Sequence, residues 1–170
     1  METTLWKLDR DIGRFRHFEV GYTHDLSRGL PKGLDAIASP SADGVVVYTG
    51  YPPHFDGVDF PVTNDGCLVM SRKMLEALEA AGEFQHEVVT VEVTDYPIQL
   101  SEWRSAVGDA HAREVLHGYV LVDGLASLDP DGLGASRLPP LFHLGSRAPF
   151  VSSRARATLE AAGIVGVELS

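Results

Sequence analysis

Apolar positions recur along this chain with two periods, one typical of strands and one typical of helices. Alternation of apolar and polar residues over 4–8, 15–23 and 87–93 predicts strands with one buried face. Residues 27–44 and 51–66 are rich in turn-forming residues and are predicted to be loops. Short β-branched or apolar runs predict further strands at 45–50, 67–70, 118–125, 141–145, 149–152 and 165–169.

A twelve-residue segment with a helical pattern occurs twice. SRKMLEALEAAG (Ser71–Gly82) returns 81 positions later as SSRARATLEAAG (Ser152–Gly163), with six of twelve positions identical. In the first copy Ser71 suits a helix N-cap, and Gly82 suits the left-handed position that ends a helix. The apolar stripe of this predicted helix consists of Met74, Leu75, Leu78 and Ala81.

The second copy has the same order of cap, helix and terminating glycine. Ser152 or Ser153 is the predicted cap, residues 155–162 the helix, and Gly163 its stop. Each copy therefore consists of a strand, a Ser cap, a helix, a Gly and a second strand. One such unit cannot bury its own apolar face, so we expect the two to pack on a shared sheet. Chance recurrence of a common helix ending is the alternative.

These elements predict an α+β fold, with short, mostly antiparallel strands and two similar strand–Ser-cap–helix–Gly–strand units packed on a sheet. A length of 170 residues is that of a single domain, residues 1–170. With 44% hydrophobic residues, the chain can bury an ordinary core without a metal or a disulfide.

The net charge of −10 changes the picture of possible partners. From Asp35 to Ser71 the chain has five Asp and no Lys or Arg. Such a field repels nucleic acid and anionic lipid and attracts basic partners. We therefore expect no nucleic-acid and no membrane partner, although an acidic surface also serves simply to keep a protein in solution.

One loop combines this charge with aromatic residues. Rigid rings on a proline-stiffened loop lose little entropy on docking, which favours a role in protein binding. The predicted partner-binding residues are Tyr51, His54, Phe55, Asp56, Asp59 and Asp65. We expect reversal of Asp56 and Asp59 to weaken binding and leave folding intact. The alternative is that Phe55, Val58 and Phe60 pin this loop to the core.

No pattern in the sequence specifies a reaction. His111 and His117 stand six residues apart with Glu114 between them, which is not the i, i+4 spacing of a helical zinc site. The single cysteine, Cys67, has no visible activating base, and Asp129 and Asp131 lie in a turn-rich segment. We therefore predict no enzyme, no catalytic residue, no metal and no cofactor.

Two absences bear on the compartment. The N-terminus has no apolar segment of the signal-peptide kind, and no apolar run reaches the length of a membrane helix. A single cysteine cannot form an internal disulfide. These features predict a cytoplasmic protein.

Three stretches resemble immunity-protein family 11 of bacterial polymorphic toxin systems, formerly a domain of unknown function. They are DFPVTNDGCLVMSRKMLEALEAAG, GYVLVDGLASLD and LFHLGSRAPFVSSRARATLEAAGIVGVEL. Residues 59–170 carry the family's order of motifs, whereas residues 1–58, the N-terminal β-rich portion, carry little of it. The resemblance also makes two Ser-capped helices expected and so favours a structural duplication.

The resemblance implies a binding protein without turnover. Such a protein would neutralise a cognate toxin domain in the cytoplasm, and its acidic surface would suit a toxin with a basic surface. Two other functions remain open: a small enzyme or metal-binding protein that uses His111, Glu114, Asp129 and Asp131, or a homo-oligomeric structural or regulatory module. The sequence does not define the oligomeric state.

Overall fold

The computed structural model describes part of the chain. The described residues are 5–11, 35–36, 45–50, 57–61, 63, 66–95, 118–130, 133, 137–145 and 148–170. The predicted strand at 15–23, most of the loop at 27–44, and the segment that contains His111 and His117 lie outside them.

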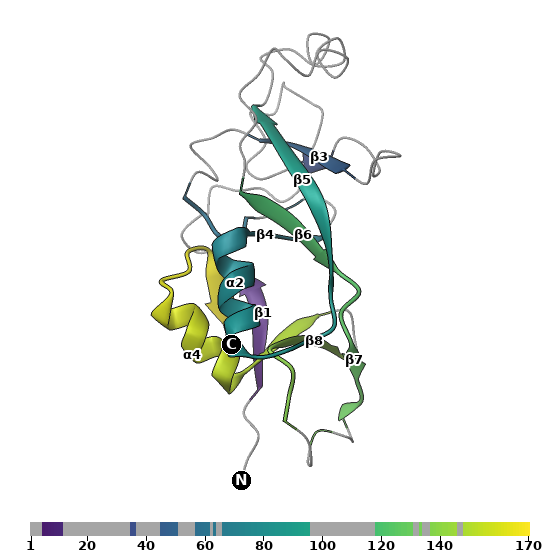
Figure 1. Cartoon of the computed structure of the whole chain (residues 1–170), viewed down its shortest axis with the longest axis vertical. Coiled ribbons are helices and arrows are strands. Elements are labelled where there is room, and N and C mark those ends of the chain that lie inside the picture. Colours follow the sequence, from purple (N-terminus) through teal and green to yellow (C-terminus); the bar gives the residue numbers. More distant parts are fainter. Residues whose placement is uncertain are drawn as a thin grey trace.

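The described chain has an α+β fold built from two sheets and two helices (Figure 1). The elements are β1 (Leu5–Arg10), β2 (Asp35–Ala36), β3 (Val45–Gly50), β4 (Leu68–Ser71), α2 (Arg72–Ala81), β5 (Glu87–Asp95), β6 (Tyr119–Asp123), β7 (Ser127–Leu128), β8 (Leu141–Leu144), β9 (Pro149–Ser152), α4 (Ser153–Ala161) and β10 (Val167–Leu169). One sheet has the order β10-β1-β9-β8-β7, and the other has the order β2-β3-β5-β6-β4. Most neighbouring strands are antiparallel; β3 with β5 and β7 with β8 are parallel.

The two copies of the repeat form the same supersecondary unit. Strands β4 and β5 both run antiparallel to β6, which lies between them, so the unit β4-α2-β5 is a split βαβ. Strands β9 and β10 flank β1 in the same way around α4. Each unit belongs to its own sheet, so the expectation of one shared sheet is wrong in this detail.

Strand register shows that the repeat extends beyond the helix. Ser71 lies opposite Tyr119, and Val88 lies opposite a residue three positions further along the same strand. Ser152 lies opposite Leu5, and Leu169 again lies opposite a residue three positions further along. Val88 and Leu169 are 81 positions apart, as Ser71 and Ser152 are. Each position of the first unit, from the serine cap to the second strand, therefore corresponds to the position 81 residues later in the second unit, with no insertion or deletion between them.

The predicted N-caps are confirmed, with Ser152 rather than Ser153 as the second one, although α4 begins at Ser153 and so starts two residues before the predicted helix. The Ser71 side chain accepts a hydrogen bond from the backbone N–H of Met74 at 3.1 Å, and Ser152 accepts one from that of Ala155 at 3.3 Å. Each serine thus satisfies one of the amides that a helix leaves free in its first turn.

The helix ends differ between the two copies. Gly163, at φ 61°, follows α4 in the left-handed conformation, and its N–H donates to the carbonyl of Glu160. The N–H of Ile164 donates to the carbonyl of Leu159, which completes a Schellman motif. Gly82 has φ 147° and ψ 174° instead, so the predicted left-handed position is wrong there, although its positive φ still favours glycine.

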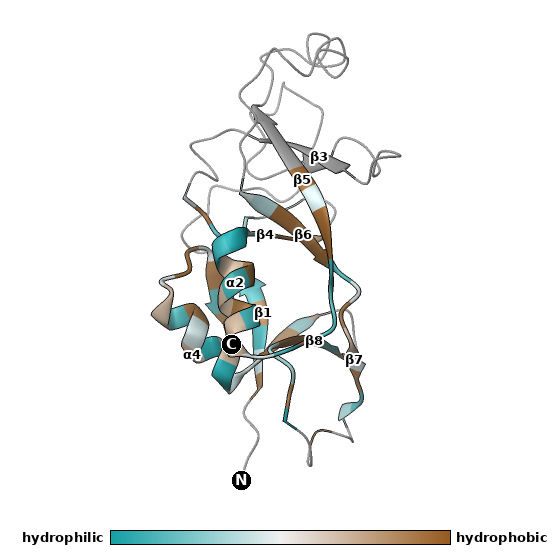
Figure 2. Cartoon of the chain, viewed as in Figure 1, coloured by the Kyte–Doolittle hydropathy of each residue, from teal (hydrophilic) through white to brown (hydrophobic). Residues whose placement is uncertain are grey.

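The predicted apolar stripe of α2 is buried, and it joins the two units. Met74, Leu75, Leu78 and Ala81 are each at most 6% exposed and belong to one core cluster with Ala155 and Leu159 of α4. The two helices lie side by side and contact each other (Figure 1). Hydrophilic and hydrophobic residues alternate around α2 in Figure 2, as expected for a helix with one buried face.

Candidate functional site

The structure describes one of the six residues predicted to bind a partner, Asp59. This residue is 7% exposed and faces the interior. The other five, Tyr51, His54, Phe55, Asp56 and Asp65, lie outside the described residues, so their role in binding stays a prediction. Val58 and Phe60 are also buried, which agrees with the alternative that this part of the loop is pinned to the core.

Asp59 links the two repeat units. One carboxylate oxygen accepts from the hydroxyl of Ser71 at 2.6 Å, and the other accepts from the backbone N–H of Val165 at 2.8 Å. Lys73 places its ammonium 3.6 Å from the second oxygen. Main-chain hydrogen bonds join the same three residues: the N–H of Asp59 donates to the carbonyl of Val165, and the N–H of Ser71 donates to the carbonyl of Asp59.

These contacts change the expectation for charge reversal. A lysine at position 59 would place a cation in a largely buried site, beside Lys73 and with no acceptor for the Val165 amide. The structure therefore assigns Asp59 to holding the fold, and we remove it from the set of residues offered to a partner.

Four of the eight Asp and Glu residues that the structure shows as exposed lie on α2, in the loop after it and at the start of β5. Glu76, Glu79, Glu83 and Glu87 are all exposed. Glu79 lies 3.3 Å from His86, and the ring of His86 stacks on Phe84. Val88, which follows Glu87, is the exposed large apolar residue of the described chain, at 47%. We name the four glutamates the α2 acidic face.

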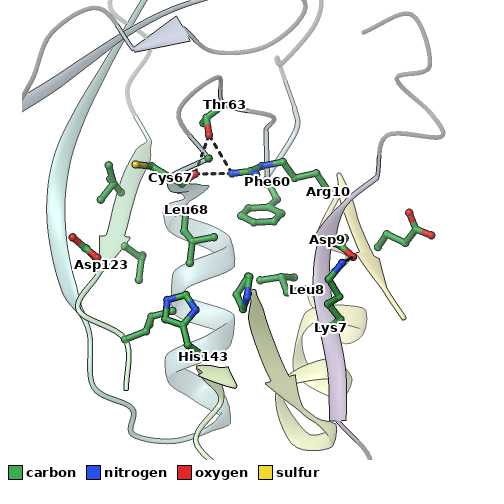
Figure 3. A pocket seen from close by; sticks show the side chains of 16 residues that line it. Lys7, Leu8, Asp9, Arg10, Phe60, Thr63, Cys67, Leu68, Asp123 and His143 are labelled. Atoms are coloured by element: carbon green, nitrogen blue, oxygen red, sulfur yellow. Dashed lines mark hydrogen bonds and ion pairs between the residues drawn. The ribbon is translucent and has the colours of Figure 1, made fainter. Parts of the chain in front are cut away.

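A cavity of about 830 Å³ opens between the two sheets (Figure 3). Strands β1, β8, β9 and β10 of one sheet and β4 and β6 of the other contribute to its wall. At one end the guanidinium of Arg10 donates to the carbonyls of Pro61 and Cys67, at 2.9 and 2.6 Å, and to the hydroxyl of Thr63 at 3.2 Å. The same guanidinium lies 4.8 Å from the centroid of the Phe60 ring. Arg10 therefore ties β1 to the segment that precedes β4.

His143 lies at the opposite end of this cavity from Arg10 (Figure 3). Its Nδ1 is buried and has no hydrogen-bond partner among the described residues. Cys67, the single cysteine, also lines the cavity and is half-buried. Sequence reasoning did not find this cavity, because its walls come from segments as far apart as Lys7 and Glu168 and no local pattern marks their meeting.

Most of the residues considered as catalytic or metal-binding candidates lie outside the described residues. His111, Glu114 and Asp131 lie outside the described residues, and Asp129 is exposed. Among the side chains that the structure places, no three His, Cys, Asp or Glu stand close enough to hold a metal ion. No helix of the described chain has the length and apolar character needed to span a bilayer.

Comparisons of the chain with protein-family models, with curated proteins and with solved structures found no match.

Proposed function

We propose that this chain is a cytoplasmic immunity protein, which binds the cognate toxin domain of a bacterial polymorphic toxin system and neutralises it by occlusion. The resemblance to immunity-protein family 11 over residues 59–170 supports this proposal. Those residues include both helices, their serine caps and the strands β4, β5, β6, β8, β9 and β10. The motifs of the resemblance are thus packing features of the fold, as expected for a protein that acts by its surface.

The distribution of charge is the observation that carries the proposal. Residues 33–103 hold twelve Asp and Glu against two basic residues, Arg72 and Lys73, which accounts for the whole net charge of −10. In the described part of this stretch, the four glutamates of the α2 acidic face are all exposed to solvent, two on α2, one in the loop after it and one at the start of β5. A surface of one sign accelerates encounter with a partner of the opposite sign and selects against like-charged partners.

Occlusion follows from the same electrostatics. A toxin domain that acts on nucleic acid needs a basic surface at or near its active site. An acidic protein docked on that surface covers it and repels the substrate, so that inhibition requires binding and no chemical step. The ammonium of Lys73 does not offset the acidic face, because it is directed to Asp59 and to the carbonyl of Gly163.

The duplication supplies a matched test of the α2 acidic face. We expect the double variant Glu79→Lys/Glu87→Lys to bind the toxin domain at least about tenfold more weakly, chiefly through a slower association rate. The neighbouring reading frames are the place to search for this toxin domain, which would be the C-terminal domain of a large secreted protein. Surface plasmon resonance at low and high salt measures both rates, and the loss should shrink as salt screens the charges.

The control places the same charges at the same positions of the other unit. Glu160 and Glu168 stand 81 positions after Glu79 and Glu87 and are also exposed. Glu79 and Glu160 are exposed, and each contacts one half-buried basic side chain, His86 or Arg156, so both variants lose one such contact. We expect Glu160→Lys/Glu168→Lys to bind as the unmodified chain does. Equal loss in both variants would show that only total charge matters and would contradict the proposed face.

A further inference from the structure

Strand register places Val88 and Thr90 of β5 on the face of their sheet that α2 covers further along. Val88 lies opposite Val122, and Thr90 lies opposite Val120. Opposite residues of an antiparallel pair point to the same face of a sheet. Val120 and Val122 are at most 2% exposed and belong to one core cluster with the buried stripe of α2. On this face, α2 therefore covers β6.

The same face is bare over the start of β5. Val88 is 47% exposed, and Thr90 is exposed as well. On the opposite face of the strand, by contrast, Val91 is 5% exposed. Neither helix crosses β5 in Figure 1. We name Val88 and Thr90 the β5 strip. A single exposed apolar side chain is ordinary on a protein surface, so its meaning depends on what borders it.

The acidic side of α2 borders the β5 strip. Glu79 lies 3.3 Å from His86, which stands two residues before Val88. Lys73 leaves α2 on another side, where its ammonium donates to the carbonyl of Gly163 at 3.0 Å. Six positions of a helix correspond to about 600° of rotation, so Glu79 and Lys73 point about 120° apart. Glu79 thus stands on the side of the strip, and Lys73 stands on the side of the second unit.

Little of the acidic charge at this border is neutralised by the described chain. Of the four glutamates of the α2 acidic face, only Glu79 has an ionic contact with a described side chain. The other three remain available to the cations of a partner. A small apolar centre beside such carboxylates fits an element that carries apolar residues on one side and Lys or Arg next to them.

A helix is the element that fits beside α2. Packed helices lie about 8–10 Å apart, whereas neighbouring strands lie about 4.8 Å apart. Strands β4 and β6 lie under α2, and β5 is the next strand of the sheet. A second helix at the usual distance from α2 would therefore lie over β5 and cover the strip.

We propose that the β5 strip is the docking site of a basic amphipathic helix of the toxin domain. The apolar side of that helix covers Val88 and Thr90, and its Lys or Arg residues pair with the α2 acidic face. The identity of the partner rests on the proposed function. The surface itself can be tested without the toxin, so the two proposals fail or succeed separately.

A fourteen-residue peptide of seven leucines and seven lysines, with leucine at helical spacing, is a suitable probe. A peptide of this length is largely unfolded alone in dilute solution, so a gain of helix reports docking. Titration of the full chain at low salt, followed by circular dichroism, should show a saturable gain of helix beyond the sum of the separate spectra. A peptide of the same composition in alternating order, which favours a strand, should bind at least about fivefold more weakly. Equal or tighter binding of the alternating peptide would exclude the helix.

Two uncharged variants separate the strip from the overall charge. Val, Thr and Ile are all β-branched and favour strands, so Val88→Thr and Val88→Ile should retain β5. Val88→Thr replaces a methyl group by a hydroxyl and should weaken binding of the helical peptide about threefold. Val88→Ile enlarges the apolar surface and should preserve or strengthen that binding. Attraction by total charge alone would give three equal affinities and would overturn the proposal, as would binding that does not saturate.

A charged variant at the same position tests the toxin domain. Val88→Lys should weaken its binding at least about tenfold, because a cation would stand where the basic helix docks. Ala161→Lys adds the same charge at an exposed position of α4 and should change the affinity much less. Circular dichroism of each free variant checks that the fold is retained. If a toxin domain binds the unmodified chain and Val88→Lys has no larger effect than Ala161→Lys, the docking site is wrong and the proposed function stands. If no toxin domain binds while the peptide behaves as expected, the proposed function is wrong and the docking surface stands.

Discussion

Replacing Gly166 by alanine is expected to destabilise the chain by about 3 kcal/mol. Gly166 has φ 91°, a conformation that costs an L-residue roughly 1–2 kcal/mol. An added Cβ would stand 2.6 Å from Cγ1 of Val58 and 3.2 Å from the carbonyl oxygen of Phe60. Val58 is buried, and the Phe60 carbonyl belongs to the main chain, so neither can move aside without cost.

Gly163 provides the control for Gly166. It also has a positive φ, 61°, but a Cβ there would meet no heavy atom within 4 Å. Gly163→Ala should therefore cost only the conformational strain, about 1 kcal/mol. Urea unfolding of both variants measures the difference. Similar losses would mean that the second unit does not approach residues 58–60 as closely as the structure has it.

Removing the Asp59 carboxylate is the second large effect that we expect. Asp59→Ala should lower the free energy of unfolding by about 3 kcal/mol, because the Val165 amide and the Ser71 hydroxyl both lose a charged acceptor. Lys73 adds little to this figure, since its side chain is 53% exposed and remains hydrated.

Asp59→Asn distinguishes the hydrogen bonds from the charge. The amide oxygen can accept from Val165, and the amide nitrogen can donate to the hydroxyl of Ser71, so we expect a loss of only about 1 kcal/mol. Thermal unfolding followed by circular dichroism compares the two variants. A cost for Asp59→Ala within about 0.5 kcal/mol, as for an ordinary surface substitution, would contradict the linking role of this residue.

Local pattern was sufficient for the elements that the sequence repeats. Serine hydroxyls cap a helix through an amide three residues away, so Ser71 and Ser152 could be assigned from neighbours alone. The buried stripe of α2 follows from the helical period in the same way. The two-residue strand β7 was not predicted, because two residues are too few to show a period.

The parts of the fold that depend on distant segments could not be predicted. The carboxylate of Asp59 meets an amide 106 positions away, and the guanidinium of Arg10 meets a carbonyl 57 positions away. In the sequence, Asp59 resembles any other aspartate of an acidic loop, and no neighbouring residue distinguishes a buried carboxylate from one that binds a partner. The pairing of both repeat units around a third strand from elsewhere in the chain likewise has no local signal.

The two repeat units differ in charge, and this difference bears on the proposed function. Two similar units, joined through their helices and through Asp59, build one core cluster. Yet the charge of the chain is concentrated in the stretch that contains the first unit, and the second unit lies in a nearly neutral one. We infer that the first unit carries the binding surface and that the second unit supports it.

Titration of a purified candidate toxin domain, taken from a large secreted protein of a neighbouring reading frame, with the purified chain tests the central claim most directly when binding is followed by calorimetry and toxin activity is assayed. The account predicts saturable, salt-sensitive binding, and toxin activity that falls in proportion to the bound fraction. An absence of binding, or inhibition that continues after the chain is removed from a chemically altered toxin, would contradict it.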